Sequence, residues 1–252
     1  MVRNNHSKDN RKKLDELLRT DEPLVKQDCL AKVLAYARFM ANIENSIVVV
    51  SDMADGKSHI VAGGFVHNLE LGDYQQENSI WESRILSLMS ADEQEEKYLA
   101  EFRFFHYLRH LPKKQRADYY LVSKLRFRFA DGGIHDVLHR MYYIFDEEKE
   151  NVRFAICIYG PMTFDFNGKS YVVNSVTGLK EELTASGNGA ILSSRESQVL
   201  SLIDSGLKSA DIANRLNISI HTVSRHRQEI ICKLQVKNTH EACRVAKALG
   251  LL

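Results

Sequence analysis

The 252-residue sequence lacks the features that mark secreted and membrane proteins. Its four cysteines, Cys29, Cys157, Cys232 and Cys243, show no C-x-x-C spacing, and there are only three prolines. Disulfide frameworks need paired cysteines in an oxidising compartment, so this usage indicates a reducing one. The polar start, residues 1–13, has no signal-peptide core, and no run approaches the ~18 apolar residues of a membrane span. We therefore expect a cytoplasmic protein with no membrane partner.

Motifs of the common enzyme classes are also missing. The sequence has no P-loop, which binds phosphate, and no G-x-S-x-G, which carries a nucleophilic serine. It also has no H-E-x-x-H, which binds a catalytic zinc ion. His106 and His110 have a spacing that suits one metal ion, but the sequence brings no further ligand to them. We therefore expect no catalytic residues, no metal site and no cofactor. An amino-terminal enzyme-like domain that binds a ligand or metal is the alternative.

Charge is unevenly distributed along the chain. From Ala190 onward there are nine Lys or Arg and five Asp or Glu, a formal charge of +4. Because the whole chain carries +1, the remainder carries −3. A basic segment is the electrostatic footprint of nucleic-acid binding, so the last quarter of the chain is the place to look for it.

Residues 192–206 have the pattern of a capped helix. Ser193 and Glu196 form an S-x-x-E capping box, in which each side chain bonds to the other residue's backbone. Apolar residues then recur at helical spacing up to Gly206, the residue type that most often ends a helix in the left-handed conformation. The segment therefore predicts the first helix of a small domain.

Two further helices follow, separated by a short turn. The second helix runs over residues 210–216 or begins at Ser209, because Lys208 is not a capping residue. After the turn at 217–219, a longer helix spans 220–234. Two helices joined by a three-residue turn are typical of units that place the second helix in a DNA major groove.

The longer helix has two different faces. Val223, Ile230 and Leu234 share an apolar face that must pack on the first two helices. On the opposite face, Arg can bond both acceptors of a guanine edge and Gln both groups of an adenine edge. The candidates for base contacts are Ser224, Arg225 and Gln228. The candidates for phosphate contacts, which flank that face, are Thr222, His226, Arg227 and Lys233.

Residues 191–252 closely resemble the LuxR-type helix-turn-helix domain of bacterial transcription factors. The matching residues are L-S-S-R-E…V-L…G-L…I-A…L-N-I-S…T-V…H-R…I…K-L…V-K-N…E-A. By this resemblance the three base-contact candidates occupy the family's base-contacting positions, and Thr222 and Lys233 its backbone-facing ones. One departure is Glu229, a negative charge that either weakens phosphate binding or orients Arg225.

Region four of bacterial sigma factors shares part of this pattern, S-x-R-E…I-A…L-x-I-S…T-V, and a sigma-factor-like promoter-recognition protein is the competing interpretation. Sigma factors usually end after the recognition helix. Here a further cap signature at 238–241 precedes a fourth helix. This helix favours the LuxR type, in which it commonly forms the dimer contact. The stripe expected to form that contact consists of Ala242, Val245, Ala246 and Leu249.

The larger amino-terminal region reads as strands around a helical middle. Two extended runs, 46–51 and 59–62, precede a helical stretch at 80–110, and three long alternating segments follow from Tyr119. This order resembles a PAS domain, a one-sheet sensory fold, through I-V-V-V-S-D…D-G-K and R-F-R-F-A-D-G-G…Y-Y-I-F-D…V-R-F-A-I-C-I-Y. The F-N-G-K turn predicts an added hairpin at 162–173.

Two other domains that accompany such helix-turn-helix units fit less well. A phosphoacceptor receiver domain needs a D-x-x-M-P loop, which does not follow the valine run. An acyl-homoserine-lactone-binding domain usually has several tryptophans, and Trp81 is the only one here.

These observations predict an α+β chain, with a PAS-like antiparallel sheet and helices followed by an all-α four-helix LuxR-type domain. The expected divisions are a helical segment at 1–42, a PAS-like sensory domain at 43–183, a linker at 184–190 and the helix-turn-helix domain at 191–252. We predict a sequence-specific transcription regulator that binds double-stranded DNA as a homodimer and is regulated by the amino-terminal sensor. RNA polymerase and a small-molecule ligand stay open as further partners.

Overall fold

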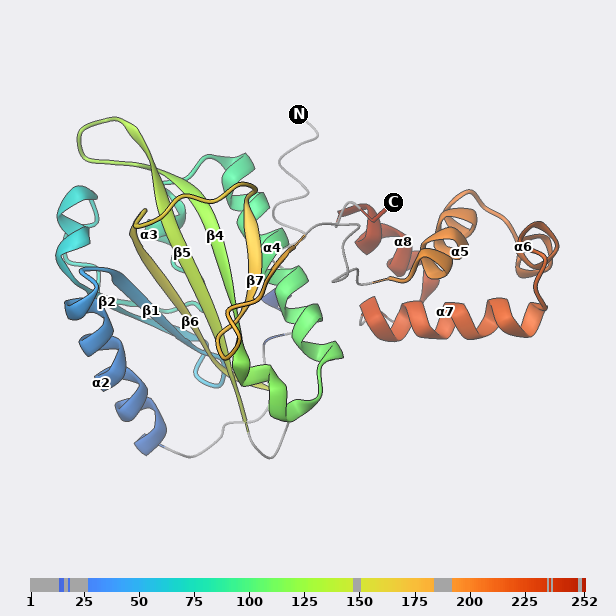
Figure 1. Cartoon of the computed structure of the whole chain (residues 1–252), viewed down its shortest axis with the longest axis horizontal. Coiled ribbons are helices and arrows are strands. Elements are labelled where there is room, and N and C mark those ends of the chain that lie inside the picture. The colour runs from blue at the N-terminus through green and yellow to red at the C-terminus, as the bar shows by residue number, and fades with distance from the viewer. Residues whose placement is uncertain are drawn as a thin grey trace. The chain divides into compact units, whose positions relative to one another are not determined.

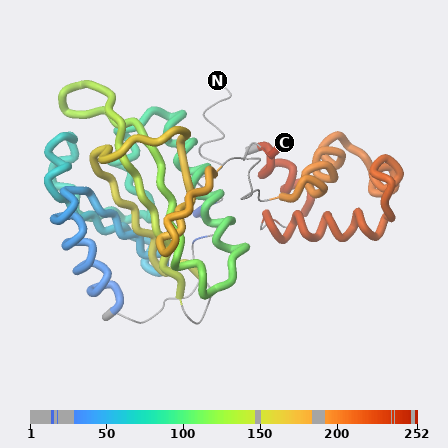
Figure 2. Tube along the Cα trace, viewed as in Figure 1, coloured from blue at the N-terminus to red at the C-terminus, as the bar shows by residue number. Residues whose placement is uncertain are grey.

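The computed structural model describes residues 14–15, 18, 27–146, 151–183, 192–234, 236, 238–248 and 251–252. The chain divides into two compact units, one built on a β-sheet and one entirely helical. Figure 1 labels their elements, and the tube in Figure 2 runs from blue through yellow in the sheet unit to orange and red in the helical unit. The predicted α+β class, with an antiparallel sheet and a carboxy-terminal helical domain, is confirmed.

The first unit contains one eight-stranded antiparallel sheet, in the order β3-β2-β1-β6-β5-β4-β7-β8. Its strands are β1 (Ile47–Asp52), β2 (Lys57–Ala62), β3 (Gln76–Glu77), β4 (Tyr119–Arg128), β5 (Ile134–Phe145), β6 (Val152–Pro161), β7 (Ser170–Asn174) and β8 (Lys180–Glu182). The two leading strands and the three long later strands match the predicted order of elements.

Helices pack against this sheet, and most of them lie in the connections that join its strands along the chain. They are α2 (Gln27–Ile43), α3 (Ser83–Leu86) and α4 (Ala91–His110), with short 3-10 helices η1 (Gly64–Asn68) and η2 (Lys113–Asp118). Within the stretch expected to be helical at 80–110, α3 ends at Leu86 and α4 begins at Ala91. Of the described helices, none combines the length and apolar character needed to cross a membrane.

The two faces of the sheet bury different chemistry. Every residue of β1 is buried, and successive side chains of a strand point to opposite faces. Val48 and Val50 pack with Ala37 and Ala41 of α2 in an apolar cluster. Cys157 and its neighbours on the other face lie beneath α4, which contributes charged side chains there. The face beneath α4 therefore buries charged side chains in addition to apolar ones.

The predicted hairpin at 162–173 is wrong. Strand β6 already pairs with β1 on one side and β5 on the other, so it has no open edge for the next strand. The chain instead crosses to the far edge and β7 pairs with β4, with Ser123 opposite Ser170. The hairpin lies one connection later, between β7 and β8, where Gly178 adopts a positive φ of 73°.

The second unit contains α5 (Ser194–Asp204), α6 (Ser209–Leu216), α7 (Ile220–Leu234) and α8 (Thr239–Ala248), and residues 103–110 of α4 are also assigned to it. The capping box is confirmed: the Ser193 side chain accepts from the Glu196 N–H, and the Glu196 carboxylate accepts from the Ser193 N–H. Gly206 has a positive φ of 83°, and α6 begins at Ser209. The predicted linker at 184–190 lies outside the described residues.

Candidate DNA interface and a buried polar cluster

The start of α7 is fixed by local hydrogen bonds. Asn217 ends α6 in the left-handed conformation, with φ of 53°. The Ser219 side chain then accepts from the Thr222 N–H at 3.0 Å and bonds the Thr222 hydroxyl at 2.8 Å. A short turn with a side-chain cap satisfies the first backbone donors of the next helix, so α7 leaves the turn in a defined direction.

The two predicted faces of α7 are both present. Val223, Ile230 and Leu234 are at most 1 % exposed and form its buried side. The three base-contact candidates are all exposed: Ser224, Arg225 and Gln228. A packed inner face and a polar outer face let the helix be held rigidly while it presents side chains to a partner.

Arg225 is held along the helix surface by Glu229. Its Nε donates to the Glu229 carboxylate at 2.9 Å, and its side chain is 74 % exposed. The hydrogen bond from Arg225 lowers the pKa of the Glu229 carboxyl from its ordinary value, and His226, at 3.4 Å, adds to the effect. The guanidinium therefore has a preferred orientation before any ligand arrives.

Two of the phosphate-contact candidates also hold the unit together. Arg227 donates to the Ser209 hydroxyl at 3.0 Å and to the Thr239 hydroxyl at 2.9 Å, which ties α7 to α6 and α8. Lys233 bonds the buried Glu196 carboxylate at 2.7 Å. Sequence reasoning assigned neither role, and their contact with phosphate stays a prediction.

The predicted dimer stripe on α8 requires a correction. Ala242, Val245 and Ala246 are at most 2 % exposed, because α8 packs this stripe against α5 and α7. Leu249 lies outside the described residues. Small residues at helical spacing suit close packing inside a domain as well as between copies, and the sequence pattern could not separate the two uses. The three side chains therefore belong to the core of the unit.

Comparison with known families agrees with this geometry. Residues 190–246 match the family described as bacterial regulatory proteins, luxR family. These residues are a LuxR-family helix-turn-helix domain. The match is to regulatory proteins rather than to enzymes, in agreement with the prediction from motifs.

Curated relatives match about a third of the chain. Over 72 residues the chain is 40% identical to "Transcriptional regulatory protein RcsB" of Escherichia coli (strain K12), covering 28% of this chain and 33% of that protein. Over 92 residues it is 34% identical to "Transcriptional activator protein EsaR" of Pantoea stewartii subsp. stewartii, covering 36% of this chain and 37% of that protein. The chain thus spans little more than a third of the length of these relatives.

Solved structures give weak likenesses over longer stretches. The Vibrio cholera VqmA–ligand–DNA complex has a TM-score of 0.33 at 15% identity, covering 88% of this chain and 89% of that one. A sensory box histidine kinase/response regulator from Burkholderia thailandensis E264 has a TM-score of 0.30 at 8% identity, covering 48% and 79%. With TM-scores this low, these likenesses support no conclusion about the fold or the function of the chain.

The sheet unit, outside the LuxR-family domain, contains a buried polar cluster that we did not predict from the sequence. The Lys97 ammonium lies 2.6 Å from the Glu101 carboxylate and 3.1 Å from the Glu82 carboxylate. These three side chains are at most 3 % exposed, and Tyr159 donates a hydrogen bond to Glu82. His139 stacks on Tyr159 with ring centroids 4.9 Å apart.

Burial and charge push the pKa values in this cluster in different directions. Burial raises the pKa of the Glu101 carboxyl above its ordinary value, against the opposing effect of Lys97. Burial acts the same way on Glu82, but Lys97 and Tyr159 outweigh it and its pKa is lowered. For His139, burial and the nearby Lys97 both lower the pKa well below its ordinary value. The pKa values of the two carboxyls therefore shift in opposite directions, and burial disfavours the charged form of the imidazole.

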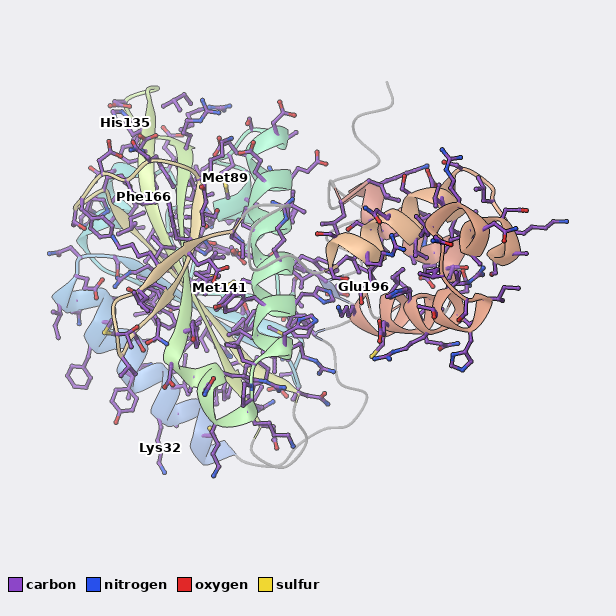
Figure 3. The ribbon with its side chains drawn as sticks, turned by 45° about the vertical axis from the view of Figure 1, so that its right-hand side comes forward. Lys32, Met89, His135, Met141, Phe166 and Glu196 are labelled. Atoms are coloured by element: carbon purple, nitrogen blue, oxygen red, sulfur yellow. The ribbon has the colours of Figure 1, made fainter. Side chains whose placement is uncertain are left out.

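The histidines of the sheet unit lie in different surroundings. His139 is fully buried and packs within the sheet. His135 is the second residue of β5, next to the β4–β5 turn, whereas Met141, the cross-strand partner of Cys157, lies in the interior (Figure 3). His106 and His110 do not belong to either group of metal-ligating side chains found among the described residues.

Proposed function

We propose that this chain is a sequence-specific DNA-binding transcription regulator. The observation that carries the proposal is the exposed face of α7, which presents Ser224, Arg225 and Gln228 from a capped helix in a LuxR-family domain. Arg and Gln can each make paired hydrogen bonds to a purine edge in the major groove, and such pairs discriminate between bases.

Phosphate contacts would position the domain on the duplex. The exposed face of α7 with Ser224, Arg225 and Gln228 is called the reading face below. The residues proposed to contact phosphate flank it and are Thr222, His226, Arg227 and Lys233. Thr222 lies in the first turn of α7, where backbone N–H groups favour anions. Contacts of this kind supply affinity without base preference, and they weaken as salt concentration rises.

A binding experiment on selected DNA tests the proposal. An operator is first selected from random duplexes, and dissociation constants are then measured by fluorescence anisotropy. Arg225→Ala should lose ~1–3 kcal/mol on the operator, roughly 5- to 150-fold, and relax the preference at one base pair. Arg244→Ala is the matched control, because Arg244 is 60% exposed on α8 and is not assigned to the reading face. An unchanged base preference in Arg225→Ala would show that the reading face is assigned wrongly.

We further propose that the regulator acts as a homodimer on an inverted repeat. One recognition helix reads few base pairs, and mismatches cost only ~1–3 kcal/mol each, too little to select a genomic site. Because the α8 stripe is internal, the contact is proposed on α2 of the sheet unit. Tyr36, Phe39 and Ile43 are 73%, 66% and 76% exposed there, beside an apolar groove of about 310 Å³. Contiguous exposed apolar surface of this kind marks protein–protein contacts.

Light scattering after size exclusion tests the dimer surface. Phe39→Asp should shift the full chain from dimer toward monomer and abolish cooperative protection of the two half-sites. Phe164→Asp is the matched control, because Phe164 is 48% exposed and lies on the connection between β6 and β7. If Phe39→Asp stays dimeric at the same concentration, the contact lies elsewhere.

The sheet unit is proposed as the sensory domain, over residues 43–183, with a helical segment before it, a linker at 184–190 and the DNA-binding domain at 191–252. A hollow of about 710 Å³, lined in part by Lys113, Arg116 and Tyr142, has a volume suited to a small organic ligand. Such a ligand would regulate by shifting the balance between binding-competent and incompetent states, with RNA polymerase as the partner of the output. Native mass spectrometry of the purified chain reports bound ligand and oligomeric state together.

A further inference from the structure

His139 has an arrangement that a folded protein rarely tolerates. Its side chain is fully buried. Among the described residues, neither of its ring nitrogens has a hydrogen-bond partner. An unsatisfied polar atom in the interior costs about 1–3 kcal/mol, so such a group requires an explanation. The surroundings of the ring supply one.

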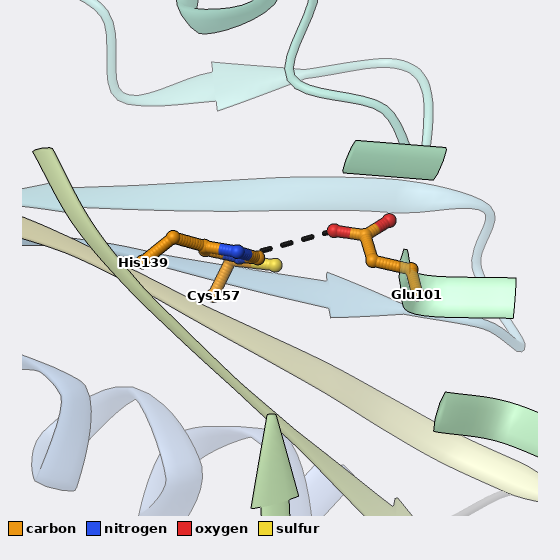
Figure 4. Close-up of side chains that lie close together, drawn as sticks. All are labelled: Glu101, His139 and Cys157. Carbon is orange, nitrogen blue, oxygen red and sulfur yellow. Dashed lines mark ion pairs between the residues drawn. The ribbon is translucent and has the colours of Figure 1, made fainter. Parts of the chain in front are cut away.

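Three potential ligand atoms converge beside this ring. A carboxylate oxygen of Glu101, a ring nitrogen of His139 and the sulfur of Cys157 all lie within 4.8 Å of one another, and all three residues are buried (Figure 4). The Nε2 of His139 lies 3.8 Å from Glu101 Oε1. Ligand atoms held at about 2.0–2.3 Å around a tetrahedral zinc ion are ~3.5 Å apart, so small side-chain adjustments close the site.

Rigid elements position these three side chains. On β5 and β6, His139 pairs with Tyr159 and Met141 pairs with Cys157, which makes His139 and Cys157 diagonal neighbours on one face of the sheet. Glu101 comes from α4, one helical turn after Lys97. Ligands on strands and helices hold their geometry better than ligands on loops.

We propose that Glu101, His139 and Cys157 bind one divalent transition-metal ion, with zinc as the ion that best suits an oxygen, nitrogen and sulfur donor set. Charge supports this occupant. A bound metal ion holds its cysteine as the thiolate, so the cluster then has three negative groups against Lys97 and the divalent ion. The sum is zero. Lys97 also keeps a carboxylate partner, since Glu82 lies 3.1 Å from it when Glu101 turns to the metal.

The space beside two of the three ligands suits a small ion or water rather than an organic molecule. A hollow of about 10 Å³ is bordered by Glu101 and Cys157, though not by His139. This is room for roughly one water molecule, whereas pockets for organic ligands measure about 300–1,000 Å³.

A second group of potential ligands, Glu196, His226 and Glu229, does not support the same proposal. Its carboxylates are already engaged, Glu196 by Lys233 and the Ser193 N–H, and Glu229 by Arg225. Its single histidine also lacks the full burial of His139, because the His226 side chain is 19% exposed.

Cobalt(II) is the probe that tests the site, because it replaces zinc and absorbs light when a thiolate binds it. Titration of the full chain with cobalt chloride should give one equivalent of bound ion, with a near-ultraviolet thiolate-to-cobalt band that zinc removes. Cys157→Ser should abolish this band. Cys232→Ser is the matched control and should keep it, since Cys232 is the exposed cysteine on α7.

Glu101→Gln provides a second variant that keeps an oxygen for Lys97. It should weaken cobalt binding about tenfold or more, with the fold checked by the fluorescence of Trp81, which packs on Tyr98 near the cluster. A folded wild-type chain without the thiolate band would overturn the proposal and leave a buried water as the partner of His139. A band that persists in Cys157→Ser, or an unchanged affinity in folded Glu101→Gln, would overturn it as well.

Discussion

Two ion pairs in this molecule have the same helical spacing and opposite surroundings. Lys97 and Glu101 on α4 are 2.6 Å apart, and each side chain is 1% exposed. Arg225 and Glu229 on α7 are 2.9 Å apart, with side chains 74% and 35% exposed. An exposed pair of this kind contributes little to stability because water screens it, whereas breaking a buried pair costs about 3–5 kcal/mol. The buried pair therefore contributes mainly to the stability of the fold, whereas the exposed pair is accessible to a binding partner.

The difference follows from the loss of water around the charges. At the surface, water screens both charges, so the attraction between Arg225 and Glu229 is small and either side chain can exchange partners. In the interior, Lys97 keeps its charge because Glu101 and Glu82 outweigh the effect of burial, and its pKa lies well above the ordinary value. The same spacing in the sequence thus gives a buried pair that stabilises the interior and an exposed pair that water screens.

The largest expected effect comes from breaking the buried pair. Lys97→Met removes the ammonium and leaves Glu82 and Glu101 buried without a cation, so the sheet unit should lose about 3–5 kcal/mol of unfolding free energy. Urea unfolding in the presence of EDTA measures this through Trp81, the single tryptophan, which is buried in that unit. The helical unit has no tryptophan and should keep its own transition, followed by circular dichroism.

A triple variant is the control for charge. Lys97→Met combined with Glu82→Gln and Glu101→Gln removes the uncompensated carboxylates and should recover most of the loss, because well-packed neutral groups can replace a buried ion pair. If the triple variant is no more stable than Lys97→Met alone, the packing of the lysine chain rather than its charge stabilises the unit.

The helical unit could be predicted closely from the sequence because its signals are local. The capping box at Ser193, the left-handed Gly206 and the turn at Asn217 each act within a few residues, and each is present in the structure. The buried and exposed faces of α7 followed from periodicity for the same reason. The use of the α8 stripe depended on which helices lie beside it, and periodicity carries no such information.

The sheet unit could be predicted only in the order of its elements. The pairing of β7 with β4 depends on which sheet edge is open, which no turn sequence states. The buried cluster was not predicted, because charged residues such as Lys97 and Glu101 lie at the solvent-exposed surface in most proteins. A signal was present: both share a helical face with Phe104 and Leu108, which are fully buried. Charged residues that continue an apolar stripe are candidates for buried pairs.

Glu196 combines features of both pairs and should give an intermediate effect. Its carboxylate is 2% exposed and holds the Ser193 N–H at 2.6 Å and Lys233 at 2.7 Å. Glu196→Ala removes the capping box and its link to α7, so the helical unit should lose about 1–2 kcal/mol. Circular dichroism during urea unfolding measures this, and Glu196→Gln is the control that keeps an oxygen for the cap. Equal losses in both variants would mean that only the charge matters.

The smallest expected effect on stability comes from the exposed pair itself. Glu229→Gln removes a surface charge whose attraction to Arg225 is screened by water, so the unfolding free energy of the helical unit should change least among these variants. DNA binding should change in two ways that can be separated. Removing a negative charge beside the phosphates should raise affinity for a scrambled duplex about twofold at low salt.

Base preference should decrease in the same variant. The Glu229 carboxylate accepts a hydrogen bond from Arg225 Nε at 2.9 Å and so orients the guanidinium before DNA binds. Loss of that orientation adds an ordering cost to each specific complex, so the ratio of operator to scrambled affinity should fall. Anisotropy titrations of both duplexes at two salt concentrations measure the ratio. An unchanged ratio with higher affinity for both duplexes would mean that Glu229 acts through its charge alone, and the exposed pair would then have no part in selecting the operator.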